Sequence, residues 1–308
     1  DLAGGCGCRV QDVAPGGRCG ARVTDVLAIR PRLFGIAYRI LASIADAEDV
    51  VQSAYLRFEE HRDAELHNPG GWLATVTARL AIDRARVLAK GRETYTGVWL
   101  PEPIVEREDD PAAQATLADD LAIGFLRVLE RLQPEERTAL LLHDAFDYSH
   151  GEVAAILGKS EEAVRQLASR ARTRVRQERP RLTIDRHKAQ QLTDRFMHAL
   201  EEADVEEMRA ILASDVVSIA DGGGKVNAAI RPIVGIDRVC RLLIGLQAKY
   251  WGETRQERLN VNGSPGIGLF TGERLWAVIS FDFEADRIRS IYVVLNPDKL
   301  PGSLDLRG

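Results

Sequence analysis

The chain has 308 residues, of which 45% are hydrophobic and 28% are charged. At about 100 to 200 residues per domain, this length predicts two or three domains, each able to bury a core. A net charge of −5 and a pI near 5.8 argue against a protein that holds nucleic acid unaided, because non-specific affinity comes from cations that neutralise phosphates.

No apolar stretch approaches the roughly 18 residues that a membrane-spanning helix needs, and no charged and then apolar leader precedes a cleavage site. We therefore expect a cytoplasmic protein without membrane contact. Residues 1–21 are rich in glycine and poor in apolar side chains, which indicates a disordered leader or an artefact of the start site. Cys6, Cys8 and Cys19 lie there and lack a fourth ligand, so no metal or other cofactor is expected.

The first folded region is predicted to be entirely helical. Apolar residues recur at helical spacing from Leu33 to Leu41, and a second helix is predicted to start at Asp46. One face of this second helix is apolar, and the other carries an acidic patch: Asp46, Glu48, Asp49 and Gln52. Such a patch suits docking on a basic partner, although an ordinary solvated helix face has the same pattern.

A loop over residues 61–71 contains the sequence Asn-Pro-Gly-Gly and interrupts the helices. A third helix is predicted over residues 72–86, with Trp72 at its start. Its polar face carries Thr75, Arg79, Asp83 and Arg86. Trp72 fits a core position as well as a surface that stacks on bases.

Residues 93–112 have no helical period and contain several prolines, which predicts a linker between domains. Trp99 and Leu100 beside Pro101 are large apolar side chains, and their exposure to water is unfavourable. A flexible, solvent-exposed linker rarely contains such a cluster. A second helical region follows the linker, beginning with apolar residues at helical spacing from Leu117. The sequence Gln133-Pro134-Glu135-Glu136 is typical of a helix opening.

This second region ends in a predicted helix-turn-helix. Ser149 and Glu152 form a capping box for its first helix, and Gly158 is suited to end that helix. Ser160 is expected to cap the second helix. The outward face of the second helix carries Glu162, Arg165, Gln166, Ser169 and Arg170, followed by Arg172, Arg174 and Arg176. These side chains suit base edges and phosphates, and a helical hairpin with a basic end is the alternative.

Positive charge is concentrated in this segment. Residues 160–188 contain nine Lys and Arg against four Asp and Glu, a local net charge of +5. Because the remainder of the chain is acidic, a DNA reader of this kind is expected to work inside a larger basic assembly.

The pattern changes beyond Ile184. Two helices, a short apolar strand over residues 216–220 and a further helix over residues 236–250 precede four alternating segments. These segments are predicted strands, over residues 255–262, 266–271, 275–284 and 288–295. Helices followed by a meander fit an α+β cone. Between the first strand and the later helix lies the sequence Asp221-Gly222-Gly223-Gly224-Lys225, whose glycines suit a tight turn with positive φ angles.

The order of these motifs resembles one known family. The sequence DAEDVVQ from Asp46, the sequence WLATVTARLAID from Trp72 and the terminal helix-turn-helix are similar to bacterial RNA polymerase sigma factors of the extracytoplasmic-function group. Residues 92–103, the motif from Asp221 to Lys225 and the sequence NPDK from Asn296 resemble the subgroup with a fused SnoaL-like C-terminal domain.

The resemblance implies a multidomain fold: two all-α sigma modules, the second with the helix-turn-helix, and a C-terminal α+β SnoaL-like, NTF2-like cone. The expected division is a leader (1–21), sigma region 2 (22–92), a linker (93–112), sigma region 4 (113–182), a SnoaL-like domain (185–300) and a tail (301–308). The implied function is to bind core RNA polymerase, to direct it to promoters and to help melt them.

The resemblance also implies roles for particular residues. The acidic patch would bind the polymerase β′ subunit, with the β subunit as a further contact. Minus-ten DNA would meet Trp72, Thr75, Arg79 and Arg86. Minus-thirty-five DNA would meet Ser160, Glu162, Arg165, Gln166, Ser169, Arg170 and Arg172. Regulation would involve Trp99, Pro101, Asp221, Gly222, Gly223, Gly224 and Lys225.

We expect the loop from Asp221 to Lys225 to pack near the linker at Trp99 and Pro101 and to set the separation of the two DNA-reading modules. Regulation inside the chain would then replace a separate anti-sigma factor, and the free chain would be a monomer. Asp215, Asp221 and His198 are candidate acid-base residues, but their spacing does not demand catalysis, so no enzymatic activity is expected.

Two other interpretations remain open from the residues alone. A one-component repressor would join a helix-turn-helix to a ligand-binding cone and bind a palindromic operator as a dimer. A cone enzyme with accessory helices is the other alternative. The repressor does not account for the acidic patch at Asp46 to Gln52 or for the helix that begins at Trp72. The arginine-rich recognition helix argues against the enzyme.

Overall fold

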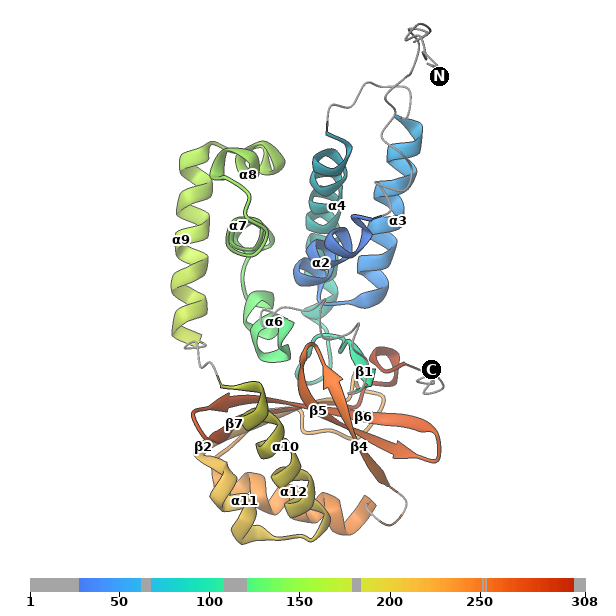
Figure 1. Cartoon of the computed structure of the whole chain (residues 1–308), viewed down its shortest axis with the longest axis vertical. Coiled ribbons are helices and arrows are strands. Elements are labelled where there is room, and N and C mark those ends of the chain that lie inside the picture. The colour runs from blue at the N-terminus through green and yellow to red at the C-terminus, as the bar shows by residue number, and fades with distance from the viewer. Residues whose placement is uncertain are drawn as a thin grey trace, which may run out of the picture.

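The computed structural model describes residues 28–61, 68–107, 121–178, 184–250, 252 and 254–301. The predicted leader, most of the predicted loop over residues 61–71, Leu117 and the tail beyond residue 301 lie outside the described residues. Figure 1 shows two groups of helices side by side, both standing on a third unit that contains the sheet. Within the described ranges, no helix combines the length and the apolar character needed to cross a membrane.

The first group of helices comprises α2 (Arg30–Leu41), α3 (Ile44–Glu60) and α4 (Pro69–Arg92). The predicted start of the second helix at Asp46 is wrong by two residues, because Ser43 is extended and its hydroxyl accepts the Asp46 N–H at 3.3 Å. The third helix likewise begins before Trp72. Asn68 caps it by accepting the N–H of Gly71 at 2.9 Å, and Pro69 occupies its first turn.

The second group comprises α6 (Ile123–Glu130), α7 (Pro134–Asp144), α8 (His150–Leu157) and α9 (Glu161–Glu178). The predicted helix-turn-helix is confirmed in its local details. Ser149 and Glu152 form the capping box, and Gly158 ends α8 with φ of 64°. The hydroxyl of Ser160 accepts the N–H of Ala163 at 3.2 Å.

The two groups of helices share one hydrophobic core. Its buried members come from both groups: Leu33, Ile36, Val51 and Leu73 from the first, and Leu126, Leu141, Val153 and Val164 from the second. The interior is continuous across the boundary, so α4 and α7 pack directly on one another instead of being separated by solvent.

The third unit is α+β, as predicted. It comprises α10 (Arg186–Glu201), α11 (Val205–Ile211), β2 (Leu212–Asp221), β3 (Ile233–Val234), α12 (Ile236–Tyr250), β4 (Arg255–Val261), β5 (Ser264–Thr271), β6 (Arg274–Glu284), β7 (Arg287–Val294) and a 3₁₀ turn, Pro297–Lys299. The meander is confirmed, since β4 to β7 pair antiparallel in sequence order. The sheet order is β1-β4-β5-β6-β7-β2-β3, with β2 parallel to β7, and the sheet is open.

The first strand of this sheet comes from the linker. Residues Val105–Arg107 form β1 and pair antiparallel with β4, so that Val105 lies opposite Val261 and Arg107 opposite Leu259. The segment between the two groups of helices is therefore hydrogen-bonded into the third unit.

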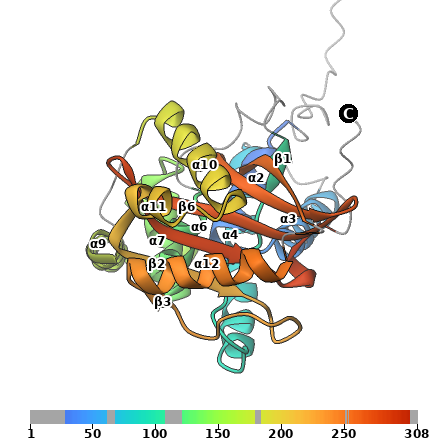
Figure 2. The ribbon, with the colours of Figure 1, turned by 90° about the horizontal axis from the view of Figure 1, so that it is seen from below.

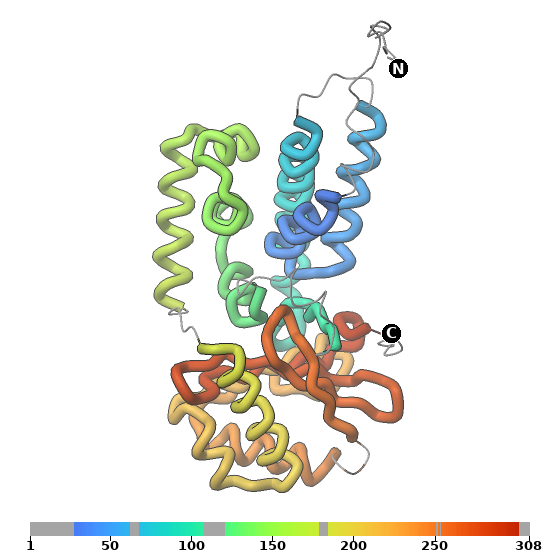
Figure 3. The backbone as a smooth tube through the Cα atoms, viewed as in Figure 1, coloured from blue at the N-terminus to red at the C-terminus, as the bar shows by residue number. Residues whose placement is uncertain are grey.

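The two faces of the sheet have different covers. One face packs against α10, α11 and α12, which lie nearest the viewer in Figure 2. The other face packs against the linker and α6, through Leu100 and Ile123. The tube in Figure 3 shows the linker running between the helices and the sheet. The linker therefore forms a layer of the molecule that covers this face of the sheet. Its apolar residues, such as Leu100, are buried there instead of being exposed to water.

Candidate promoter-reading faces and the linker clamp

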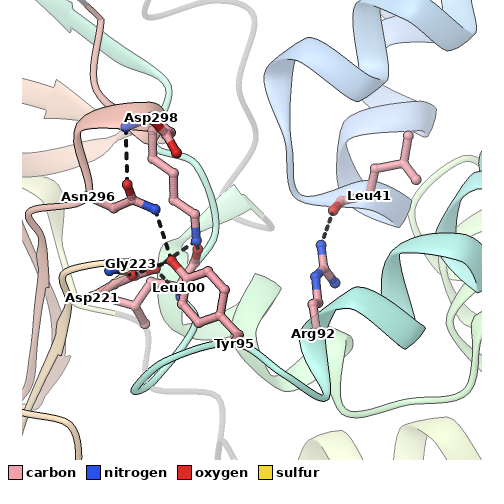
Figure 4. A network of polar contacts seen from close by, with 9 residues as sticks. Leu41, Arg92, Tyr95, Leu100, Asp221, Gly223, Asn296 and Asp298 are labelled. Carbon is pink, nitrogen blue, oxygen red and sulfur yellow. Dashed lines mark hydrogen bonds and ion pairs between the residues drawn. The ribbon is translucent and has the colours of Figure 1, made fainter. Parts of the chain in front are cut away.

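The carboxylate of Asp221, at the end of β2, is fully buried and binds the linker. Its Oδ1 accepts hydrogen bonds from the Tyr95 hydroxyl at 2.6 Å and from the Gly223 N–H at 3.0 Å. Its Oδ2 accepts the N–H of Leu100 at 2.8 Å. The side-chain amide of Asn296 donates to the same Tyr95 hydroxyl at 2.9 Å (Figure 4). Burial, and then the hydrogen bond to Asp221, raise the pKa of Tyr95, so its hydroxyl stays a donor at neutral pH.

Lys299 completes this contact. Its Nζ lies 2.6 Å from Asp221 Oδ2 and donates to the carbonyl of Leu100 at 2.6 Å. Two cations lie close to the Trp99 ring, with Lys299 Nζ 4.1 Å and Arg92 Cζ 3.7 Å from its centroid. Burial lowers the pKa of Lys299 to about 8, although the pairing with Asp221 opposes this shift. We call Asp221, Asn296 and Lys299 the linker clamp.

A second attachment lies further along the linker. The side-chain oxygen of Asn262, in the turn between β4 and β5, accepts the N–H of Ile104 at 3.0 Å, and its own N–H donates to the Ile104 carbonyl at 2.8 Å. Its amide also donates to the Tyr38 hydroxyl at 2.7 Å. That hydroxyl donates to the carbonyl of Glu102 at 2.6 Å. Asn262 thus joins the sheet, the linker and α2.

Arg137 and Arg92 connect the two groups of helices. The buried guanidinium of Arg137 donates to the carbonyls of Leu129 at 2.8 Å and Glu130 at 2.9 Å, and also to the carbonyl of Ile40 in the first group. The Glu130 carboxylate pairs with both Arg137 and Arg92. Removing one partner would leave a buried charge uncompensated, which is strongly unfavourable.

A further contact joins α4 to α8 and α7. Arg79 donates to the carbonyl of Ile156 at 3.0 Å and to that of Ala155 at 2.7 Å. Both carbonyls lie in the last turn of α8, where a cation is favoured. Arg86 binds Glu135 at the start of α7 at 2.5 Å. The polar face of α4 is therefore partly covered by the helix-turn-helix.

The outward face of α9 is open. Five exposed side chains line one shallow depression on it: Glu162, Arg165, Gln166, Ser169 and Arg170. Several arginines of this helix also form ion pairs within the molecule. Arg165 pairs with Glu161 on the same helix, Arg172 with Asp144, and both Arg170 and Arg174 with Glu136.

Comparison with known proteins decides the family. Residues 26–90 match the model of Sigma-70 region 2, and residues 124–175 match that of Sigma-70, region 4. The chain is 37% identical over 296 residues to ECF RNA polymerase sigma factor SigJ of Mycobacterium tuberculosis, which covers 91% of this chain and 94% of the relative. The chain belongs to the ECF family of RNA polymerase sigma factors.

Two further similarities extend over most of this sigma factor. The crystal structure of SigJ from Mycobacterium tuberculosis superposes with a TM-score of 0.76 at 35% identity, and the match covers 92% of this chain and 99% of that one. The protein named "Probable ECF RNA polymerase sigma factor SigI" from the same organism is 28% identical over 277 residues, 89% of this chain and 92% of the relative. Both similarities include the C-terminal unit as well as the sigma modules.

The members of the acidic patch differ in their partners and in their exposure. Asp46 is paired with Arg84 of α4 at 2.6 Å, and Glu48 with Arg30 of α2. Asp46 is also largely covered, with 15% of its side chain exposed. The remaining two members are exposed: Asp49 and Gln52.

The predicted minus-ten residues lie along α4 in different settings. Trp72 is partly buried, with its ring 6.0 Å from that of Phe58 and 5.5 Å from that of His61. The hydroxyl of Thr75 donates to the carbonyl of Gly71 at 2.9 Å. With Arg79 and Arg86 held by the second module, this face is occupied by the sigma factor itself.

Several residues that attach the linker were not among the predicted site residues: Tyr38, Tyr95, Asn262, Asn296 and Lys299. Asn262 followed by Gly263 is a hairpin-turn signal, and both residues have positive φ. That signal predicts the turn but not the binding of Ile104, which lies 158 positions away in the chain. Tyr38 falls on the buried face of α2, where a hydroxyl needs a partner.

The three candidate acid-base residues do not converge. Asp215 and His198 are exposed, whereas Asp221 is buried against the linker. Within the described residues, no group of three or more His, Cys, Asp or Glu side chains could hold a metal ion. Cys240 is a free, buried cysteine, and burial raises the pKa of its thiol.

Proposed function

We propose that this sigma factor binds core RNA polymerase through the exposed side of the acidic patch and reads promoters with two faces. The face of α4 around Thr75, Arg79 and Arg86 would meet the minus-ten element. The face of α9 would meet the minus-thirty-five element. The open depression on α9 supports the second assignment, because its side chains are those that contact base edges in a major groove.

We further propose that the C-terminal unit regulates the separation of these faces. The observation that carries this proposal is the capture of the linker by the buried Asp221 carboxylate, which binds Tyr95, Leu100 and Lys299 at once. Because the linker joins the two sigma modules, its attachment limits how far they move apart. Regulation would then be part of the chain, without a separate anti-sigma factor or catalytic chemistry.

Reconstituted transcription tests the first proposal. Mixing the protein with core polymerase should give specific initiation, and replacing Asp49 and Gln52 by alanine should weaken core binding. Glu60→Ala provides a matched control, because Glu60 is exposed on the same helix outside the acidic patch. Core binding that responds equally to both changes would contradict the docking assignment.

The regulatory proposal needs a different comparison. Asp221→Ala and a chain ending at Leu182 should each change the relative use of promoters with different spacing between the two elements, because the linker is released. If both variants bind core polymerase normally and use promoters as the intact protein does, the regulatory proposal is wrong. The sigma function would not be affected by that result.

A further inference from the structure

A cavity of about 1100 Å³ lies in the C-terminal unit, between α12 and the sheet. Its walls are mainly apolar and include Leu200, Leu242, Leu243, Leu269, Ile279 and Val293. Exposed large apolar side chains also line it. Val226 is 42% exposed, and Leu246 and Tyr250 are each 41% exposed. Apolar side chains that remain open to solvent around a concave site are typical of ligand-binding sites.

Among the described residues that line the cavity, the charged side chains are all cationic. Lys225, Lys249 and Arg274 line it, and none of the described lining residues carries a carboxylate. Lys225 is paired with Asp298 at 2.6 Å, whereas Lys249 and Arg274 are exposed. Trp276 lines the same cavity, and its indole N–H is buried without an acceptor in the described part of the chain. An unmet donor of this kind favours a ligand that carries acceptor oxygens.

We propose that this cavity binds a small apolar molecule with a single carboxylate, such as an aliphatic or aromatic acid. The apolar part would lie along α12 and the sheet, and the carboxylate would lie near Arg274 and Lys249. Binding would remove the exposed apolar side chains from water and would give the two cations an anionic partner.

The cavity is built from the same segments as the linker clamp. In β2, successive side chains point to opposite faces, so Ala220 lines the cavity while Asp221 binds the linker. After β7, Pro297 and Leu300 line the cavity while Lys299 binds Asp221. A ligand that orders these two segments would therefore strengthen the hold on the linker. This second step rests on the proposed regulatory function, whereas ligand binding does not.

Fluorescence titration of the full chain with decanoate tests the binding step. Decanoate should change the tryptophan emission saturably, because Trp276 lines the site, and Trp276→Phe should reduce this change. Decan-1-ol has the same apolar chain without the charge and should bind more weakly. Equal binding of the acid and the alcohol would overturn the anionic assignment, and no saturable change with either would overturn the site.

Three variants sharpen this test. Arg274→Gln should weaken decanoate binding about 2- to 5-fold, as expected for a solvent-screened ion pair, and should leave decan-1-ol binding unchanged. Arg238→Gln is the matched control, since Arg238 is exposed on α12 but does not line the cavity. Leu246→Trp narrows the mouth without changing a fully buried position and should weaken both ligands. Identical affinities in all three variants would place binding elsewhere.

Hydrogen exchange tests the coupling step separately. The N–H of Leu100 is bonded to Asp221 Oδ2, so saturating decanoate should slow its exchange at least about 2-fold. The N–H of Ala163 in α9, bonded to Ser160, should exchange at an unchanged rate. Decanoate binding with no change at Leu100 would overturn the coupling while leaving both the site and the proposed promoter-reading function standing.

Discussion

At the scale of single residues, the pKa of the buried Lys299 makes the stability of the fold depend on pH. Its side chain is 11% exposed, and burial lowers its pKa to about 8 from the ordinary 10.5. The folded protein therefore releases this proton before the unfolded chain does. Between pH 8 and about 9.5 the unfolded chain binds more protons, so the Lys299 contribution raises the free energy of unfolding as pH rises.

Urea unfolding of the intact protein and of Lys299→Met at pH 8.0 and 9.5 measures this contribution. The intact protein should gain more stability over this interval than the variant, which has no proton to release. The window stops below pH 10, where tyrosines of the unfolded chain begin to ionise. An identical change in both proteins would contradict the assignment.

Arg165 is a second single residue whose role can be tested, and it lies on the open face of α9. Its ion pair with Glu161 is on the surface and contributes little to folding. We expect Arg165→Ala to weaken recognition of one minus-thirty-five base by about 1 to 3 kcal/mol and to leave the unfolding midpoint nearly unchanged. Transcription from promoters that differ at that single base is the measurement. An equal loss at all of them would indicate a phosphate contact instead.

At the scale of elements, the turn after β2 must approach both the linker and the last segment of the chain. Gly223 has φ of 63°, and a side chain there would collide with Asn296, which binds Tyr95. Gly272 has a similar φ of 59° with open space around it. Alanine at either position carries the same backbone strain. The difference in stability between the two variants therefore measures how closely the turn at Gly223 packs against Asn296.

We expect Gly223→Ala to be less stable than Gly272→Ala by about 1 to 3 kcal/mol, the usual cost of overpacking. Equilibrium unfolding of the two variants gives this difference. Equal destabilisation would mean that Asn296 moves aside freely and that the turn is not closely fitted to the clamp.

At the scale of the whole molecule, the two sigma modules are packed on each other. Arg79 binds the last turn of α8, and Arg86 binds α7. If Arg79 and Arg86 bind minus-ten DNA as proposed, they cannot keep these contacts at the same time, and the proposal then requires the modules to separate on the promoter. The shared core and the Arg137 network resist that separation, and core polymerase would have to supply the free energy.

Energy transfer between dyes measures this opening. Val87 on α4 and Gln177 on α9 are both exposed, and neither belongs to the proposed DNA-reading faces. Cysteines at these positions, in a chain with Cys6, Cys8 and Cys19 replaced by serine, would carry the dyes. Transfer should fall when core polymerase is added and should stay constant with buffer or non-specific DNA alone. Unchanged transfer in an active holoenzyme would show that the packed arrangement also initiates transcription.

The sequence determined the local structure and the family. Capping boxes, the left-handed Gly158, the helical periods and the alternating strands depend on near neighbours, so Ser149, Glu152 and the meander could be predicted. Tertiary structure decided which distant groups meet. The resemblance already placed the loop from Asp221 near the linker, and the hydrogen bond from Leu100 to Asp221 agrees with that expectation. It did not indicate that Asn262 binds Tyr38, 224 positions earlier, or that β1 joins a sheet from another unit. The physical reason is burial, because a polar group removed from water must find partners wherever the fold brings them, and residue spacing along the chain does not record that meeting.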